Sequence, residues 1–162
     1  MEHPYCFVIM PFGEKKDAQG AVTDFDVVYE EIIEEVMEKR LEIKCLRSDK
    51  VQAPGWIHRD MLQHIVQADV AVVDISTLNA NVFYELGVRH ALRKGVTLLI
   101  RKKGTQIPFN IRGLRIIEYD LDIKSAHKAQ DEIEQFIRNG LKAQINDSLV
   151  YEIFPQLTVS IP

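Results

Sequence analysis

Short apolar segments alternate with longer amphipathic segments along the whole chain. The apolar segments lie at residues 5–10, 41–46, 70–75, 96–100 and 114–119. The run at 70–73 contains no polar residue, which is typical of a parallel strand that is covered on both faces. We therefore predict five buried β-strands, each followed by a loop or a helix.

Four segments repeat their apolar residues at helical spacing, and they occupy residues 24–39, 56–67, 81–93 and 125–145. In the first of them, Val28, Ile32 and Val36 fall on one face of the predicted helix. Asp24 and Ser125 are the predicted N-caps of the first and the last helix.

Strands that alternate with helices in a chain of 162 residues predict a single three-layer α/β domain over residues 1–162. Right-handed crossovers favour a flavodoxin-like sandwich with a five-stranded parallel sheet in the order 2-1-3-4-5. This order brings the loop at 10–13 beside the segment at 74–85. The C-terminal tail at 150–162 is too apolar to remain free in water, so we expect it to dock on this domain or on a neighbouring subunit.

Charge and composition exclude several classes of function. The net charge of −4 gives no electrostatic reason to expect a nucleic acid as a partner. No apolar run approaches the roughly 18 residues of a membrane span, and the first residues lack the pattern of a secretory signal. The two cysteines, Cys6 and Cys45, lie inside predicted strands and show no metal-ligand spacing. We therefore expect a reduced, cytoplasmic protein with no membrane partner, no metal and no cofactor.

A carboxylate, Glu85, is predicted about one turn inside the helix that follows the strand at 70–75. In open α/β sheets, ligands bind beyond the carboxyl ends of the strands, next to such helix N-termini. The helix N-terminus carries partial positive charge and free N–H groups, which favour an ionised Glu85. The structural alternative is that Asn79 or Asn81 is an ordinary N-cap and that Glu85 complements the helix dipole.

Three segments carry a resemblance to a known superfamily. They are Phe7-Val-Ile-Met-Pro-Phe-Gly13, Ala68-Asp-Val-Ala-Val-Val-Asp74 and Asn79-Ala-Asn-Val-Phe-Tyr-Glu-Leu-Gly87, the last followed by Ala91. From about residue 5 to residue 120 the chain resembles the nucleoside 2-deoxyribosyltransferase-like superfamily, and more closely its bacterial branch of TIR-like predicted nucleotide-binding proteins. The resemblance implies a flavodoxin-like fold and chemistry at an N-glycosidic bond, either transfer of a deoxyribosyl group or hydrolysis of a nucleotide. The related Toll/interleukin receptor (TIR) domains include enzymes that cleave NAD at the nicotinamide bond.

The resemblance also implies roles for individual residues. Glu85 matches the catalytic glutamate of the transferases, and Asn79 stands where they carry an aspartate that helps to hold the substrate. Residues 108–110 resemble their Pro-x-Asn segment, which implies that Asn110 reaches the active site, with a dimer interface as one route. Two departures, the amide at Asn79 and a tail that ends differently at 160–162, favour hydrolysis or nucleotide binding over transfer.

The other substrate-binding candidates lie at the ends of the first three predicted strands or in the segments that follow them. They are Met10, Pro11, Phe12, Gly13, Arg47, Asp49, Asp74, Ser76 and Asn81. Hydroxyl and amide groups among them can hold sugar hydroxyls, and Arg47 can bind a phosphate. The structural alternatives are a turn cap for Asp74 and a core plug for Phe12. For Arg47 the alternative is a surface ion pair with Asp49.

Breaking an N-glycosidic bond develops positive charge at the anomeric carbon of the sugar, and a carboxylate can attack that carbon or stabilise the cation. The sequence therefore favours a nucleotide- or nucleoside-binding domain that cleaves the N-glycosidic bond of NAD, a nucleotide or a deoxynucleoside through Glu85. The competing hypothesis is a non-catalytic module that senses a nucleotide or binds a partner protein, although such a module has no need of Glu85. We also expect a homodimer or larger homo-oligomer, because the tail and the Asn110 loop have no obvious place in a minimal five-stranded domain.

Overall fold

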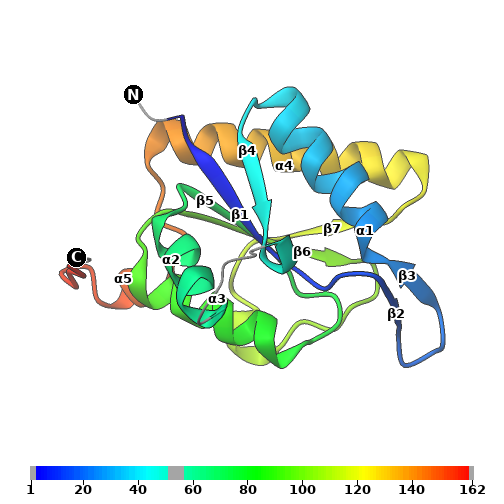
Figure 1. The fold of residues 1–162 in the computed structure, drawn as a ribbon, viewed down its shortest axis with the longest axis horizontal. Coiled ribbons are helices and arrows are strands. Elements are labelled where there is room, and N and C mark those ends of the chain that lie inside the picture. Colours follow the sequence, from blue (N-terminus) through cyan, green and yellow to red (C-terminus); the bar gives the residue numbers. More distant parts are fainter. Residues whose placement is uncertain (1–2, 51–56, 161–162) are drawn as a thin grey trace.

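The structure, a computed structural model, describes residues 3–50 and 57–160. Its main sheet consists of β1 (Tyr5–Ile9), β4 (Lys44–Arg47), β5 (Val70–Asp74), β6 (Val96–Lys102) and β7 (Ile116–Tyr119). These five strands are all parallel and lie in the order β4-β1-β5-β6-β7 (Figure 1). The predicted flavodoxin-like three-layer α/β sandwich and its strand order 2-1-3-4-5 are therefore confirmed.

Helices cover both faces of the sheet. One face carries α1 (Phe25–Val28), its π-helical continuation η1 (Tyr29–Arg40), and α4 (Ile123–Ala143). The opposite face carries α2 (Ile57–Gln67) and α3 (Ala80–Leu92), and α5 (Leu149–Ile153) packs against α3 (Figure 1). Trp56, the predicted first residue of the second helix, lies outside the described residues.

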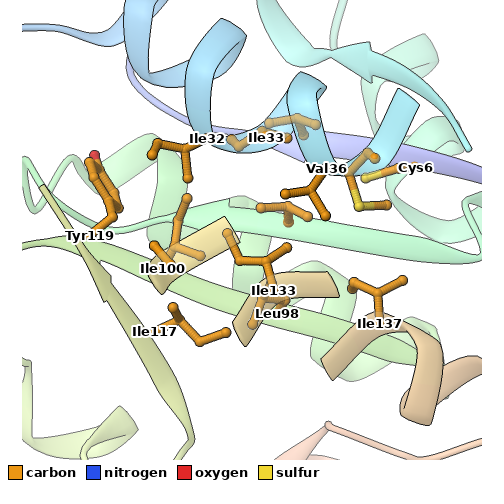
Figure 2. Close-up of a cluster of buried hydrophobic side chains, with 14 of the residues drawn as sticks. Cys6, Ile32, Ile33, Val36, Leu98, Ile100, Ile117, Tyr119, Ile133 and Ile137 are labelled. Atoms are coloured by element: carbon orange, nitrogen blue, oxygen red, sulfur yellow. The ribbon is translucent and has the colours of Figure 1, made fainter. Parts of the chain in front are cut away.

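The alternation of side chains along each strand produces two separate hydrophobic clusters. In β1, Cys6 and Val8 belong to one cluster, whereas Phe7 and Ile9 belong to the other. Figure 2 shows part of the first cluster, in which residues of η1, α4 and the strands meet: Ile32, Ile33, Val36, Ile133, Ile137, Leu98, Ile100 and Ile117. Helices cover both faces, and ligands of open α/β sheets bind beyond the carboxyl ends of the strands.

The helix starts agree only in part with the sequence. Asp24 is the N-cap of α1, as predicted, and its side chain accepts the backbone N–H of Asp26 at 2.9 Å. The predicted cap of the last helix is wrong, because Asp122 is the N-cap of α4 and its carboxylate accepts the backbone N–H of Ser125 at 3.0 Å. A carboxylate placed three residues ahead satisfies that free N–H, so the helix begins earlier than Ser125.

A short antiparallel hairpin follows β1 in a polar stretch for which the sequence predicts no strand. Its strands are β2 (Glu14–Lys16) and β3 (Val22–Asp24). The carboxylate of Asp17 accepts the backbone N–H groups of Gln19 and Ala21, both at 2.9 Å, and so shapes the turn. The sequence signal is weak because each strand has only three residues and β2 is fully exposed.

The C-terminal tail docks on the domain only at its beginning. The side chain of Tyr151 in α5 is buried, and the Ser148 hydroxyl donates to the carbonyl of His90 at 2.6 Å. Beyond that point Ile153, Phe154 and Leu157 are 67%, 60% and 40% exposed. The described part of the tail therefore presents an apolar surface, which we call the tail patch and define by these three residues.

Candidate functional site

Glu85 lies in the second turn of α3, on the face of that helix that packs on the sheet. The side chain of Asn79 accepts the backbone N–H of Asn81 at 2.8 Å, so Asn79 is the N-cap of this helix. Val82 and Leu86, on either side of Glu85, belong to the hydrophobic cluster that contains Ile9 and Ile75. Glu85 is thus held near the carboxyl ends of β1 and β5, where ligands bind in this class of fold.

The carboxyl group of Glu85 is buried without a partner. The residue is 8% exposed, and its Oε2 atom receives no hydrogen bond from any residue that the structure describes. Burial raises the pKa of Glu85 to about 7, so burial outweighs the helix N-terminus that favours the ionised form. A buried carboxyl whose pKa is near 7 can give and take a proton at neutral pH, as general acids and bases do.

The carboxylate of Asp74 accepts hydrogen bonds from Ser76 and Tyr119. The residue is fully buried, and its carboxylate accepts the backbone N–H of Ser76 at 2.9 Å and the Tyr119 hydroxyl at 2.6 Å. The Ser76 hydroxyl also donates to Asp74 and accepts the backbone N–H of Lys102 at 2.7 Å. Burial raises the pKa of Asp74 to about 6, although these hydrogen bonds oppose the shift. The contacts tie the ends of β5, β6 and β7 together and favour the structural alternative for Asp74.

The guanidinium of Arg47 also forms ion pairs within the chain, with Asp49 and Asp26. It donates to both carboxylate oxygens of Asp49 and, at 2.7 Å, to Asp26. It lies 5.1 Å from the ring centroid of Tyr29. Asp26 in turn accepts the backbone N–H of Gly13 at 3.3 Å. These contacts fasten the end of β4 to the loop after β1, and they favour the ion-pair alternative, with the difference that Arg47 is buried rather than on the surface.

The remaining candidates differ in exposure. Met10 and Pro11 are buried, whereas Phe12 is 53% exposed and lies beside the ammonium of Lys15, so Phe12 is not a core plug. Gly13 has a φ of +66°, which a residue with a side chain rarely adopts. Asn79, Asn81 and Asn110 are exposed, and Asn110 lies in η3 (Phe109–Ile111) between β6 and β7. Among the predicted site residues, Glu85 is therefore the one with a buried carboxyl oxygen that lacks a hydrogen bond from the described part of the chain. The exposed amides of Asn79 and Asn81 lie at the start of the same helix.

Sequence reasoning missed Arg89, which lies one helical turn after Glu85 on the same face of α3. Its side chain is fully buried and donates to the backbone carbonyls of Ile65, Ala68 and Val96 at 2.8, 2.7 and 3.1 Å. Burial lowers the pKa of Arg89 to about 10. The sequence signal for a buried structural arginine is its position four residues after Glu85, on a helix face whose other residues are largely apolar. Arg89 joins α2, α3 and β6, and so holds in place the helix that carries Glu85.

A cavity at the carboxyl edge of the sheet was also missed. It has a volume of about 530 Å³ and lies between the β2–β3 hairpin and the loops that follow β5 and β6. Of the predicted residues, Ser76 lines this cavity, whereas Glu85 does not. Its signal in the sequence is weak and consists of the basic run at 101–103.

Within residues 3–50 and 57–160, no group of three or more histidine, cysteine or acidic residues is arranged to hold a metal ion. In the same part of the chain, no helix has the length and apolar character needed to cross a membrane. The chain matches no protein-family model and no curated protein. The candidate function therefore rests on the motifs quoted above and on the geometry around Glu85.

Proposed function

We propose that this protein binds a nucleotide or nucleoside and cleaves its N-glycosidic bond, with Glu85 as the catalytic carboxylate. The observation that carries the proposal is the buried, unpartnered carboxyl of Glu85 in the second turn of α3. The resemblance to the nucleoside 2-deoxyribosyltransferase-like superfamily and its TIR-like branch supports the same residue. Buried polar groups are almost always hydrogen-bonded in native proteins, so an unsatisfied carboxyl calls for a functional explanation.

The chemistry follows from the position of the charge. As the bond between the base and the anomeric carbon breaks, the base leaves with the electron pair and the sugar becomes a cation. The ionised form of Glu85 stabilises this cation or attacks it, and water then supplies the hydroxyl group to the anomeric carbon. Because the pKa of Glu85 is about 7, its ionised form is populated at neutral pH, and the proton that the departing base takes up comes from the attacking water.

A non-catalytic nucleotide sensor is the second candidate. The internal contacts of Asp74, Arg47 and Asp49 favour it, because they leave Glu85 without a second free carboxylate among the predicted residues. Enzymes that cleave glycosidic bonds commonly use a pair of carboxylates. Glu85 itself weighs against the sensor, because simple binding does not require a buried carboxyl with no partner.

The two candidates are separated by incubating the purified protein with NAD, nucleoside monophosphates and deoxynucleosides. Chromatography of each mixture measures the free base, and calorimetry on the same samples measures binding. We expect base to be released from at least one of these compounds. Binding without release from any compound contradicts the enzyme and selects the sensor.

We further propose that the tail patch is covered by a second copy of this chain. Contiguous exposed apolar surface marks association sites, and Ile153, Phe154 and Leu157 are close in sequence and 40–67% exposed. At about 50 µM, static light scattering should give the mass of a dimer or larger oligomer. Phe154→Ser should shift that mass towards the monomer, whereas Ile123→Ser, which alters an apolar residue that is 77% exposed on α4, should not. A monomeric wild type contradicts this assembly.

A further inference from the structure

The cavity between the β2–β3 hairpin and the sheet edge is positively charged in a protein that is negative overall. Its lining includes four lysines, Lys15, Lys16, Lys102 and Lys103, and one acid, Asp17. The net charge of the whole chain is −4. The hairpin supplies the first two lysines and β6 with its loop supplies the others, so two segments that are far apart in sequence meet at the cavity (Figure 1).

The four lysines of the lining make no direct ion pair within the described residues. Lys102 donates instead to the hydroxyl of Thr23 at 2.6 Å, and this contact fixes the hairpin over the end of β6. The carboxylate of Asp17 faces its own turn, where two backbone N–H groups bind it. Lys15 places its ammonium over the ring of Phe12, which does not line the cavity. The remaining excess of lysines in the lining favours an anion there.

The other lining groups suit an anion that carries oxygen atoms. Thr77 contributes a hydroxyl, and Gln19 and Gln106 contribute amide N–H donors. The volume of about 530 Å³ falls in the range of small-molecule sites. The loop at 76–78, which lines the cavity, runs directly through Asn79 into α3 and hence to Glu85. A ligand whose anionic group occupies the cavity is therefore held at the same sheet edge as Glu85.

We propose that this lysine cavity binds the phosphate groups of the substrate, which makes the substrate a phosphorylated nucleotide rather than a free nucleoside. The nucleotide part of this statement rests on the proposed function, whereas the anion site stands on the cavity alone. Arg47, the phosphate ligand predicted from the sequence, is occupied by Asp49 and Asp26. The lysine cavity takes the role that the sequence assigns to Arg47.

Inorganic pyrophosphate tests the site without requiring the base or the sugar to be known. The double variant Lys16→Gln with Lys103→Gln removes one exposed charge from each wall of the cavity. Calorimetry at low salt should show that the wild type binds pyrophosphate and that the double variant binds it at least about tenfold more weakly. The double variant Lys128→Gln with Lys142→Gln, which removes two exposed lysines of α4 outside the cavity lining, is the matched control and should change the affinity less than about twofold.

The outcomes separate this proposal from the proposed function. Absence of pyrophosphate binding, or an equal loss in the control, overturns the phosphate site. Cleavage of free deoxynucleosides with nucleotides left intact overturns it as well, while the N-glycosidase stands. If pyrophosphate binds in the expected pattern but no compound releases base, the anion site stands and the catalytic proposal falls.

Discussion

Glu85→Gln is expected to abolish most release of base from whichever compound the wild type cleaves. The substitution keeps the size of the side chain but removes the negative charge that stabilises the anomeric cation. Loss of such a preorganised partner typically costs about 3 kcal/mol or more, which is roughly a hundredfold in rate. Measurement of kcat and KM should place the loss in kcat, because binding of the phosphate and the base does not depend on this charge. Equal turnover by the variant and the wild type would show that Glu85 is not catalytic.

The same substitution should stabilise the fold at alkaline pH. The pKa of Glu85 is raised from 4.5 to about 7 in the folded protein, so the folded state binds the proton more tightly than the unfolded state. The stability that this provides is fully present below pH 4.5 and is lost as the pH rises through 7. Above that range the wild type bears a cost of about 3 kcal/mol for a buried charge, and the glutamine variant does not.

Urea unfolding at about pH 5 and about pH 8 measures this difference directly. Glu85→Gln should gain stability relative to the wild type between the two pH values, since the other titrating groups are common to both proteins. The matched control is Glu31→Gln, which removes an exposed carboxylate of η1 and should show no such change. Together the two results would identify Glu85 as a residue retained at a cost to stability, as active-site groups often are.

The architecture could be predicted because its signals are local and repeated. The unbroken apolar run at 70–73 and the helical spacing of Val28, Ile32 and Val36 each report burial directly. With five strands alternating with helices, handedness leaves few strand orders to choose from. The hairpin at 14–24 was missed because its β-strands are short, polar and largely exposed, so that no periodicity marks them.

The candidate site was harder to predict because partners far apart in sequence decide the role of each side chain. Arg47 and Asp74 stand at the carboxyl ends of β4 and β5. Contacts with Asp26 and Tyr119 nevertheless give both an internal role that spacing cannot reveal. The pKa of Glu85 likewise depends on how deeply α3 packs, which the sequence expresses only as apolar neighbours. The hairpin and the loop after β6, which both line the lysine cavity, are far apart in sequence. Folding alone brings these two segments together, so the sequence pattern does not reveal the cavity.

Arg89→Met is expected to destabilise the protein strongly. The fully buried guanidinium donates to the carbonyls of Ile65, Ala68 and Val96, and methionine removes these three hydrogen bonds. Removal of one side of a buried polar network typically costs about 3 to 5 kcal/mol. The urea midpoint should therefore fall sharply.

Arg138→Met provides the matched control for that measurement, because Arg138 is 57% exposed and pairs with Glu134 on the surface of α4. Its loss should cost less than about 1 kcal/mol. If Arg89→Met is too unstable to purify, Arg89→Lys restores one donor and should show an intermediate midpoint. A loss below about 1 kcal/mol in either Arg89 variant would mean that the carbonyls find other donors, and that α3 does not depend on Arg89 to hold Glu85 at the sheet edge.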